Sequence, residues 1–187
     1  MSKPVLQVVV SSVRLGRVSP IVAEWFADEA RKHGAFEVEV ADLAELNLPL
    51  MDEPNHPIMQ AYQHEHTKRW AKIVERSDAF VFVVPEYDHG YPAPLKNAID
   101  YLFNEWAYKP VSFVSYGGIS AGLRAVQQLK PVLSALRMVP IVEQVMIPMI
   151  GAHLVDGKFV PNEIITESVA PALDELAKLE GALASLR

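Results

Sequence analysis

Hydroxyl and guanidinium groups gather in the segment Ser11–Ser19, which reads SSVRLGRVS and follows a short run of valines. Serine hydroxyls and the forked cation of arginine are both suited to binding phosphate. Free N–H groups and the dipole at the start of a helix also favour an anion. Pro20 favours a helix start there, with Ser19 as the N-cap. The segment therefore predicts a phosphate site, although an ordinary polar loop with a serine cap would have a similar sequence.

A second candidate segment, Pro85–Pro92, reads PEYDHGYP and follows another apolar run. Its prolines restrict the backbone, and Gly90 permits an unusual turn. Tyr87 could line a flat aromatic ligand or pack as a partly buried side chain, and both interpretations stay open. His89 could act as a general base, but a single histidine in a loop is more often simply solvated.

The third candidate segment, Ser115–Gly122, reads SYGGISAG. Paired glycines after a strand let a ligand approach the backbone closely, although they also suit a tight turn before a helix. Neither this segment nor the first has the spacing of a G-x-G-x-x-G or a Walker phosphate loop. Together the three segments predict a mononucleotide site, with one loop for the phosphate and two walls for a flat ring.

The elements that must position these segments alternate between strand and helix. Nearly continuous apolar runs are typical of strands buried in a parallel sheet. The expected strands are Val5–Val10, Phe36–Val40, Ala79–Val84, Pro110–Tyr116 and Pro140–Ile147. The expected helices are Pro20 to about Gly34, about Glu65–Arg76, Leu95–Trp106, Leu123–Arg137 and Glu163–Leu186.

This alternation predicts an α/β protein with a flavodoxin-like three-layer sandwich. Its five-stranded parallel sheet should have the order 2-1-3-4-5, within a single domain over residues 1–187. Ligands of such sheets bind beyond the carboxyl ends of the strands, where the three candidate segments fall. Trp25, Trp70 and Trp106 lie at core-like helical spacing, so we expect them to pack. The apolar face of Leu95–Trp106 hints at a dimer interface.

Composition narrows the function classes. The 187 residues include 17 Lys and Arg against 23 Asp and Glu, a net charge of −6, which argues against general nucleic-acid binding. The absence of cysteine excludes disulfides, thiolate catalysis and Cys-ligated metals. The first apolar run is too short for a signal peptide or a membrane span, so we expect a cytoplasmic protein without membrane contact.

Three motifs resemble the NADPH-dependent FMN reductase family. SSVRLGR-VSP is similar to its G-S-x-R-x-x-R phosphate loop, with Ser11 where the family usually has Gly. PEYDHGYPAPLKNAIDYL resembles P-E-Y-N-x-x-x-P-x-x-L-K-N-A-I-D, with Asp88 where Asn is usual. SYGGISAGLRAVQQL looks like S-Y-G-G-x-x-G-x-R-A-x-x-Q-L. The likeness covers most of residues 5–147.

The resemblance implies FMN as cofactor, NADPH or NADH as electron donor, and a homodimer or homotetramer. Carried over by position, the phosphate would be held by Ser12, Arg14, Val18 and Ser19, whereas Arg17 would bind there or face the nicotinamide nucleotide. One wall of the isoalloxazine site would consist of Pro85, Glu86, Tyr87 and Asp88, largely through backbone groups. The opposite wall would consist of Ser115, Tyr116, Gly117 and Gly118.

The implied activity is FMN-dependent NAD(P)H oxidoreduction of a flavin, quinone or similar small acceptor by ping-pong hydride transfer. The flavin would carry the chemistry, so no catalytic side chain and no metal are expected. The main alternative is a flavodoxin-like electron carrier without nicotinamide-dependent activity. A metal site at His64, Glu65 and His66, with His56 as a further candidate ligand, is less favoured, because these residues lie in or beside a long polar connection. A hydrolase is not supported, because there is no G-x-S-x-G.

Overall fold

Five parallel strands lie side by side in the central sheet of the computed structural model, which describes residues 3–187. Their order is β2-β1-β3-β4-β5, and a further strand, β6, also pairs with β4 in parallel. The order predicted from the sequence is therefore confirmed. The strands are β1 Val5–Val10, β2 Glu37–Asp42, β3 Ala79–Pro85, β4 Pro110–Tyr116, β5 Val139–Pro140 and β6 Val145–Ile147.

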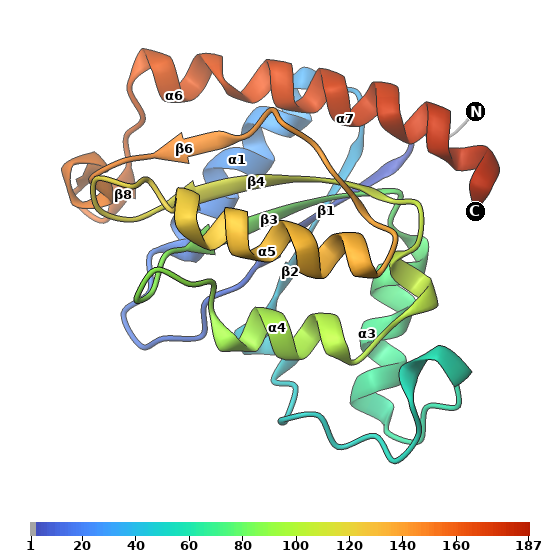
Figure 1. Ribbon diagram of the computed structural model, residues 1–187. Helices are drawn as coiled ribbons and strands as arrows, with labels where there is room; N and C mark the ends of the chain where they lie inside the picture. Colours follow the sequence, from blue (N-terminus) through green and yellow to red (C-terminus); the bar gives the residue numbers. More distant parts are fainter. Residues whose placement is uncertain (1–2) are drawn as a thin grey trace.

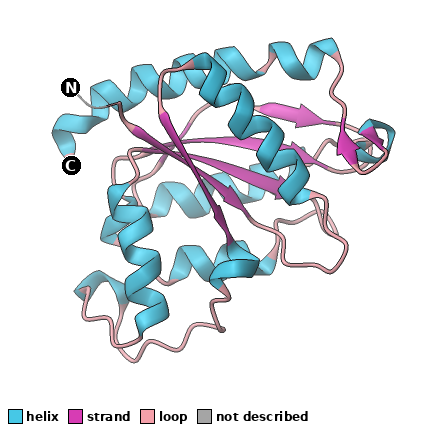
Figure 2. Ribbon diagram, turned by 180° about the vertical axis from the view of Figure 1, so that it is seen from behind, coloured by secondary structure: helices cyan, strands magenta, loops and turns pink. Residues whose placement is uncertain are grey.

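Helices cover both faces of the sheet (Figure 1). One face carries α1 Ser19–His33, α6 Glu163–Glu167 and α7 Val169–Leu183, whereas the other carries α2 Leu43–Leu46, α3 Glu65–Arg76, α4 Ala93–Asp100 and α5 Leu123–Ala135. Short 3₁₀ helices occupy η1 Pro57–Met59, η2 Asn104–Trp106, η3 Ile150–His153 and η4 Ala184–Leu186. Seen from behind, the strands fan out with the twist typical of parallel sheets (Figure 2).

Two apolar cores result from this layering, one on each face of the sheet. The central strands β3 and β4 are buried along their whole length, which explains their continuous runs of β-branched and aromatic residues. Trp70 and Trp106 are buried in one core, and the partly buried Trp25 packs against the other. The predicted packing of all three tryptophans is confirmed.

The fifth strand differs from the expectation. Instead of one strand over Pro140–Ile147, two short strands pair successively with β4, at Pro110–Val111 and then at Val114–Tyr116. Pro140 has no N–H group to donate to a neighbouring strand, and after the Ile141 N–H, which donates to the Val111 carbonyl oxygen at 3.0 Å, residues 142–144 belong to no strand.

Two expected helices are also interrupted. The segment Leu95–Trp106 contains α4, which ends at Asp100, and then the separate turn η2. Its apolar side chains Leu95, Ile99, Leu102 and Trp106 are all buried in the core. They leave no free apolar face, so the structure removes the basis for the dimer interface that the sequence hinted at there. The closing helix is divided at Ser168 into α6 and α7.

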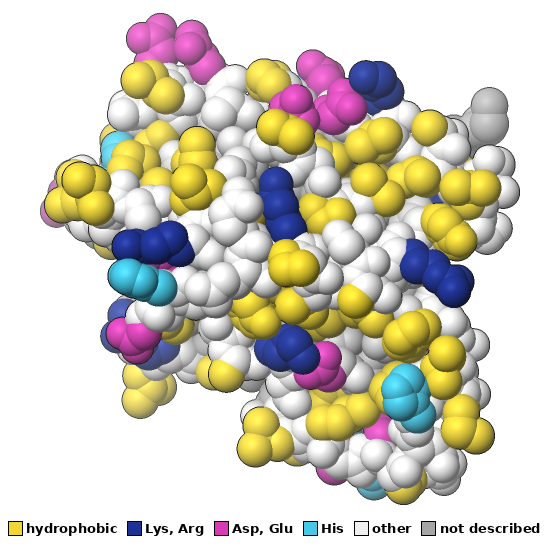
Figure 3. All heavy atoms as spheres, in the orientation of Figure 1, with side chains coloured by type: hydrophobic (Ala, Val, Ile, Leu, Met, Phe, Trp, Pro, Cys, Tyr) yellow, Lys and Arg dark blue, Asp and Glu magenta, His cyan; other side chains and the backbone are white. Residues whose placement is uncertain are grey.

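A small antiparallel pair, β7 Leu154–Val155 and β8 Lys158–Phe159, was not expected from the sequence. On the face drawn in Figure 3, the Lys and Arg side chains are scattered among hydrophobic and acidic ones. Within residues 3–187, no helix combines the length and the apolar character that crossing a membrane requires.

Candidate cofactor site

The three candidate segments meet at the carboxyl edge of the sheet, as predicted. They follow β1, β3 and β4, which are neighbours in the sheet. The Ser12 and Tyr87 hydroxyls are hydrogen-bonded at 2.7 Å, which joins the first segment to the second. The hydroxyls of Ser19 and Tyr116 lie 2.5 Å apart, which joins the first segment to the third. We call the three segments together the cradle.

The first segment offers backbone donors. Within residues 3–187, the N–H groups of Val13, Gly16 and Val18 have no backbone acceptor. Gly16 has a φ of 70°, the left-handed conformation that glycine adopts without strain. Such N–H groups in front of a helix form an anion-binding turn. The backbone therefore fits the predicted phosphate.

Ser11 occupies its position without strain. Its hydroxyl is buried and donates to the carbonyl oxygen of Val83 at 2.6 Å, on the neighbouring strand β3. Its backbone has no positive φ that would call for glycine. The side chain therefore fastens the end of β1 to β3.

Ser19 is not the N-cap that the sequence suggested. The helix α1 begins at Ser19 itself, Val18 holds the cap position, and no side chain caps the helix. The Ser19 hydroxyl is committed instead to Tyr116. Burial raises the pKa of Tyr116 to about 12, so its hydroxyl stays protonated at neutral pH and can serve in this contact as donor or acceptor.

The two arginines of the first segment have different surroundings. Arg17 forms a bidentate ion pair with Asp42, at 2.5 and 2.7 Å, and also donates to the carbonyl oxygen of Ser12 at 2.6 Å. The hydrogen bond to Asp42 raises the pKa of Arg17. Arg14 is exposed, and its guanidinium has only a 3.5 Å contact with the carbonyl oxygen of Gly16. Arg14 is therefore free to bind an anion, whereas Arg17 braces the loop against the end of β2.

The second segment turns sharply at its tip. Tyr87 and Gly90 exchange backbone hydrogen bonds of 2.9 and 2.8 Å around Asp88 and His89. Both central residues have a positive φ, 48° and 69°. Asn and Asp tolerate this conformation better than most residues, so Asp88 suits a turn in which Asn would also fit. The expectation that Gly90 supplies the unusual conformation was wrong, because its φ is not positive.

Glu86 braces the second segment against the third. Its N–H group donates to the carbonyl oxygen of Tyr116 at 3.0 Å. Its carboxylate accepts from the Arg124 Nε at 2.6 Å and from the Arg124 backbone N–H at 3.2 Å. Burial acts to raise the pKa of Glu86, but the hydrogen bonds from Arg124 and Ser120 outweigh it, and the pKa is lowered. The ionised side chain thus faces α5, which leaves backbone groups for a ligand.

The third segment approaches other backbone closely. The carbonyl oxygens of Gly117 and Gly118 accept from Ile150 and Met149, at 3.0 and 2.9 Å. Gly122 has a φ of 80°, and a Cβ there would lie 2.7 Å from the Tyr116 nitrogen. Ser115 Oγ is buried and has no hydrogen-bond partner within residues 3–187. The N–H groups of Met149 and Ile150 therefore fix the backbone of this segment. A Cβ at Gly118 would meet nothing within 4 Å, so the backbone there is open to a ligand.

Sequence reasoning missed two of these supporting residues, Asp42 and Arg124. Each lies on an element outside the candidate segments, and each pairs with a charge inside one. An acidic residue at the end of β2 and a cation at the start of α5 were available as signals, but the pairing depends on the strand order.

The arrangement fits FMN. A phosphate has the free N–H groups, the Ser12 hydroxyl and Arg14 at the first segment, and a flat ring has backbone walls from the other two. Within residues 3–187, no cluster of three or more His, Asp or Glu residues is placed to hold a metal. His64 and His66 are stacked on each other at 5.2 Å, and both contact Asp52.

Comparisons with known proteins agree with this site. The family model for NADPH-dependent FMN reductase matches residues 5–152. An NAD(P)H-dependent FMN reductase of Schizosaccharomyces pombe is 43% identical over 137 residues, 72% of this chain and 68% of the relative. A quinone reductase of Pseudomonas putida is 36% identical over 132 residues, 65% of this chain and 66% of the relative.

Among solved structures, FerB, an NAD(P)H:(acceptor) oxidoreductase from Paracoccus denitrificans, superposes with a TM-score of 0.76. The match covers 96% of this chain and 98% of FerB at 22% identity, and it confirms the fold. The expected class, an oxidoreductase that uses FMN and NAD(P)H, is confirmed by the sequence matches. The chain belongs to the NADPH-dependent FMN reductase family.

Proposed function

We propose that this protein binds FMN in the cradle and transfers electrons from NADPH or NADH to a small acceptor, such as a quinone or a free flavin, in a ping-pong reaction. The observation that carries the proposal is the pair of hydroxyl contacts, Ser12 to Tyr87 and Ser19 to Tyr116, which bring the phosphate loop and both walls together. FMN, when bound, accepts a hydride from the nicotinamide and passes the electrons on.

The residues of the chain bind and orient rather than react. Arg14, Ser12 and the N–H groups of Val18 and Ser19 hold the phosphate. Arg17 acts as a positioning residue, because its guanidinium is bound by Asp42 and supports the Ser12 carbonyl. The backbone of Pro85–Asp88 and of Ser115–Gly118 lines the ring. No proton transfer by a side chain is required in this scheme.

The experiment combines binding with rapid kinetics. Purified protein is loaded with FMN and mixed anaerobically with NADPH or NADH in a stopped-flow instrument, while the flavin absorbance is followed. We expect bleaching within the time of one turnover and its reversal by benzoquinone. Steady-state double-reciprocal plots should give parallel lines, as a ping-pong order requires. A protein that retains FMN but is reduced by neither nucleotide would be a flavodoxin-like carrier, contrary to the proposal.

A cytoplasmic location and a homodimeric or homotetrameric state are also part of the proposal. The support for an oligomer lies at the cradle, where the apolar side chains of Leu15 and Ile119 are 94% and 89% exposed. Large exposed apolar side chains beside a functional site favour a partner surface. Light scattering tests the oligomeric state, and cell fractionation tests the location.

A further inference from the structure

A cavity of about 430 Å³ adjoins the cradle, and Val13 is the one residue of its described lining that belongs to the three candidate segments. Val13 of the phosphate loop borders it on one side, and Ala93, which directly follows the second segment, borders it on another. Ala44 of α2, Leu48 and Leu50 of the following connection and Asn97 of α4 complete the part of the lining used below. The cavity therefore opens between two of the three loops of the cradle.

The lining suits an uncharged, mostly apolar group. None of its nine described residues is charged, and seven of them are Val, Leu, Ala or Pro. The volume lies in the range of small-molecule sites, about 300–1,000 Å³. Leu50 is 84% exposed, so a bound apolar group would remove a large apolar surface from water. Glu45, beside Ala44, is also exposed and would oppose an anion there, whereas the exposed cation beside Val13, Arg14, is assigned to the FMN phosphate.

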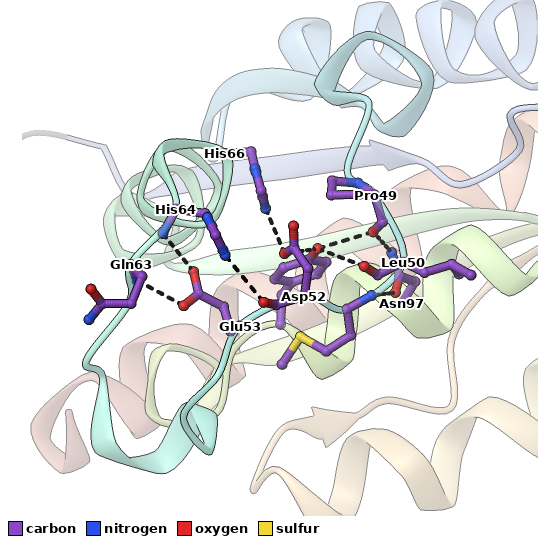
Figure 4. Close-up of polar contacts among 10 residues, drawn as sticks. Pro49, Leu50, Asp52, Glu53, Gln63, His64, His66 and Asn97 are labelled. Carbon is purple, nitrogen blue, oxygen red and sulfur yellow. Dashed lines mark hydrogen bonds and ion pairs between the residues drawn. The ribbon is translucent and has the colours of Figure 1, made fainter.

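The outer wall of the cavity is held in place rather than loose. This wall belongs to the segment Leu48–Glu53, here called the strap, which runs over α3 and α4 (Figure 4). Both atoms of the Asn97 amide are bound to it, Nδ2 to the Pro49 carbonyl oxygen at 2.6 Å and Oδ1 to the Met51 N–H at 3.0 Å. The Tyr101 hydroxyl also lies 3.1 Å from the Pro49 carbonyl oxygen.

The far end of the strap is fastened to α3. The Asp52 carboxylate is 2.9 Å from the Tyr101 hydroxyl and 3.0 Å from His66 Nε2, and His64 Nε2 lies 3.2 Å from the Asp52 carbonyl oxygen. Glu53 accepts from the backbone N–H groups of Gln63 and His64. In Figure 4, Leu50 points away from both histidines. Because the wall is anchored on both sides of Leu50, its backbone loses little conformational entropy when a ligand binds.

We propose that this cavity is a subsite for the uncharged apolar substituent of the electron acceptor, such as the alkyl tail of a substituted quinone, and that it disfavours acceptors with an anionic substituent. The inference rests on the proposed function and deepens it, because it assigns acceptor preference to a place outside the cradle. Asn97 is a positioning residue in this scheme, since it holds the strap and its amide atoms are already occupied.

The test compares three acceptors: unsubstituted benzoquinone, an alkyl-substituted benzoquinone and a sulfonated quinone. The variants are Leu50→Ala, Ala44→Glu and Ala44→Lys. Ile58→Ala serves as the matched control, because Ile58 is a half-exposed aliphatic residue of the same connection that does not line the cavity. The first readout is kcat/KM for each acceptor. The second is the Kd of each quinone for the oxidised, FMN-loaded protein without nicotinamide, measured by calorimetry.

We expect Leu50→Ala to weaken both measures for the alkyl quinone by about fivefold and to leave benzoquinone unchanged. Ala44→Glu should weaken the alkyl quinone by about tenfold, and Ala44→Lys should shift the preference toward the sulfonated quinone. Ile58→Ala should match the unmodified protein throughout.

An unchanged preference in all three variants would overturn the subsite. So would a change of oligomeric state in Ala44→Glu, seen by light scattering, without a change in preference, because the cavity would then be covered by a second copy of the chain. Failure of the proposed function has a different signature, since the unmodified protein would then reduce no quinone at all. The calorimetric titration still tests the subsite in that case.

Discussion

The cradle and the strap lie side by side at the same edge of the sheet, but different kinds of contact hold them. Buried neutral hydroxyls, backbone hydrogen bonds and glycines join the three segments of the cradle to one another, and the ion pairs Arg17–Asp42 and Glu86–Arg124 brace it from neighbouring elements. Exposed carboxylate, imidazole and amide groups fix the strap. Buried contacts between neutral groups are insensitive to pH and salt near neutrality, whereas solvent-exposed charged contacts are weak and adjustable. A cofactor that stays bound suits the first arrangement, and an acceptor that must leave suits the second.

The largest expected effect on the cradle comes from Gly122→Ala. The added Cβ meets backbone at 2.7 Å, and the φ of 80° is strained for alanine. We expect a loss of about 2–4 kcal/mol in the free energy of unfolding, measured with urea. Gly118→Ala is the matched control for stability, because a Cβ there meets nothing within 4 Å. An equal loss of unfolding free energy in both variants would contradict the close approach of Gly122 to the Tyr116 backbone.

The next prediction distinguishes the roles of the two arginines of the phosphate loop, Arg14 in FMN binding and Arg17 in stability. Arg14→Ala should weaken FMN binding by about tenfold to a hundredfold, since it removes a charge-assisted contact. Arg17→Ala should lower the free energy of unfolding by about 1–2 kcal/mol instead, because it leaves Asp42 unpaired. FMN fluorescence quenching and urea unfolding measure the two quantities. An exposed arginine of α1, changed in Arg31→Ala, should alter neither by much.

Tyr116→Phe tests the link between the first and third segments. At pH 7 we expect a loss of about 1 kcal/mol, because the Ser19 hydroxyl loses its partner. The pKa of Tyr116 is raised from 10.0 to about 12, so the folded protein binds this proton more tightly than the unfolded chain. Stability from this group is complete below about pH 10 and is lost as the pH rises toward 12. Unmodified protein should therefore lose more stability than Tyr116→Phe over that interval.

The smallest effect belongs to the strap. Burial acts to raise the pKa of Asp52, but hydrogen bonds from His66 and Tyr101 lower it. The ionised Asp52 therefore stabilises the folded protein above the ordinary pKa of 3.8, and this stabilisation is lost as the pH falls below that value. In Asp52→Asn, the amide of Met51 should exchange with solvent faster by less than about tenfold at pH 7, since the contacts are exposed. Exchange in β3 should not change, and a change there would show that the strap supports the core.

Local patterns along the chain were enough to predict most of the fold. Valine-rich runs identified β1, β3 and β4, and helical spacing identified α3 with the bounds that the structure has. The same patterns could not show that the fifth strand divides or that α4 ends at Asp100, because both boundaries depend on tertiary contacts with neighbouring elements. The apolar side chains of Leu95–Trp106 hinted at a dimer interface because burial against the sheet has no local signal in the sequence.

For the site, the sequence by itself determined which residues meet, since the loops after β1, β3 and β4 must share one edge of a sheet in this order. Only the tertiary structure decided what each side chain does there. It turned Ser19 toward Tyr116, bound Arg17 to Asp42 and left Arg14 free. The physical reason is that loop membership follows from strand order, whereas the choice between two equivalent arginines depends on a carboxylate 25 residues away that only folding brings within 2.5 Å.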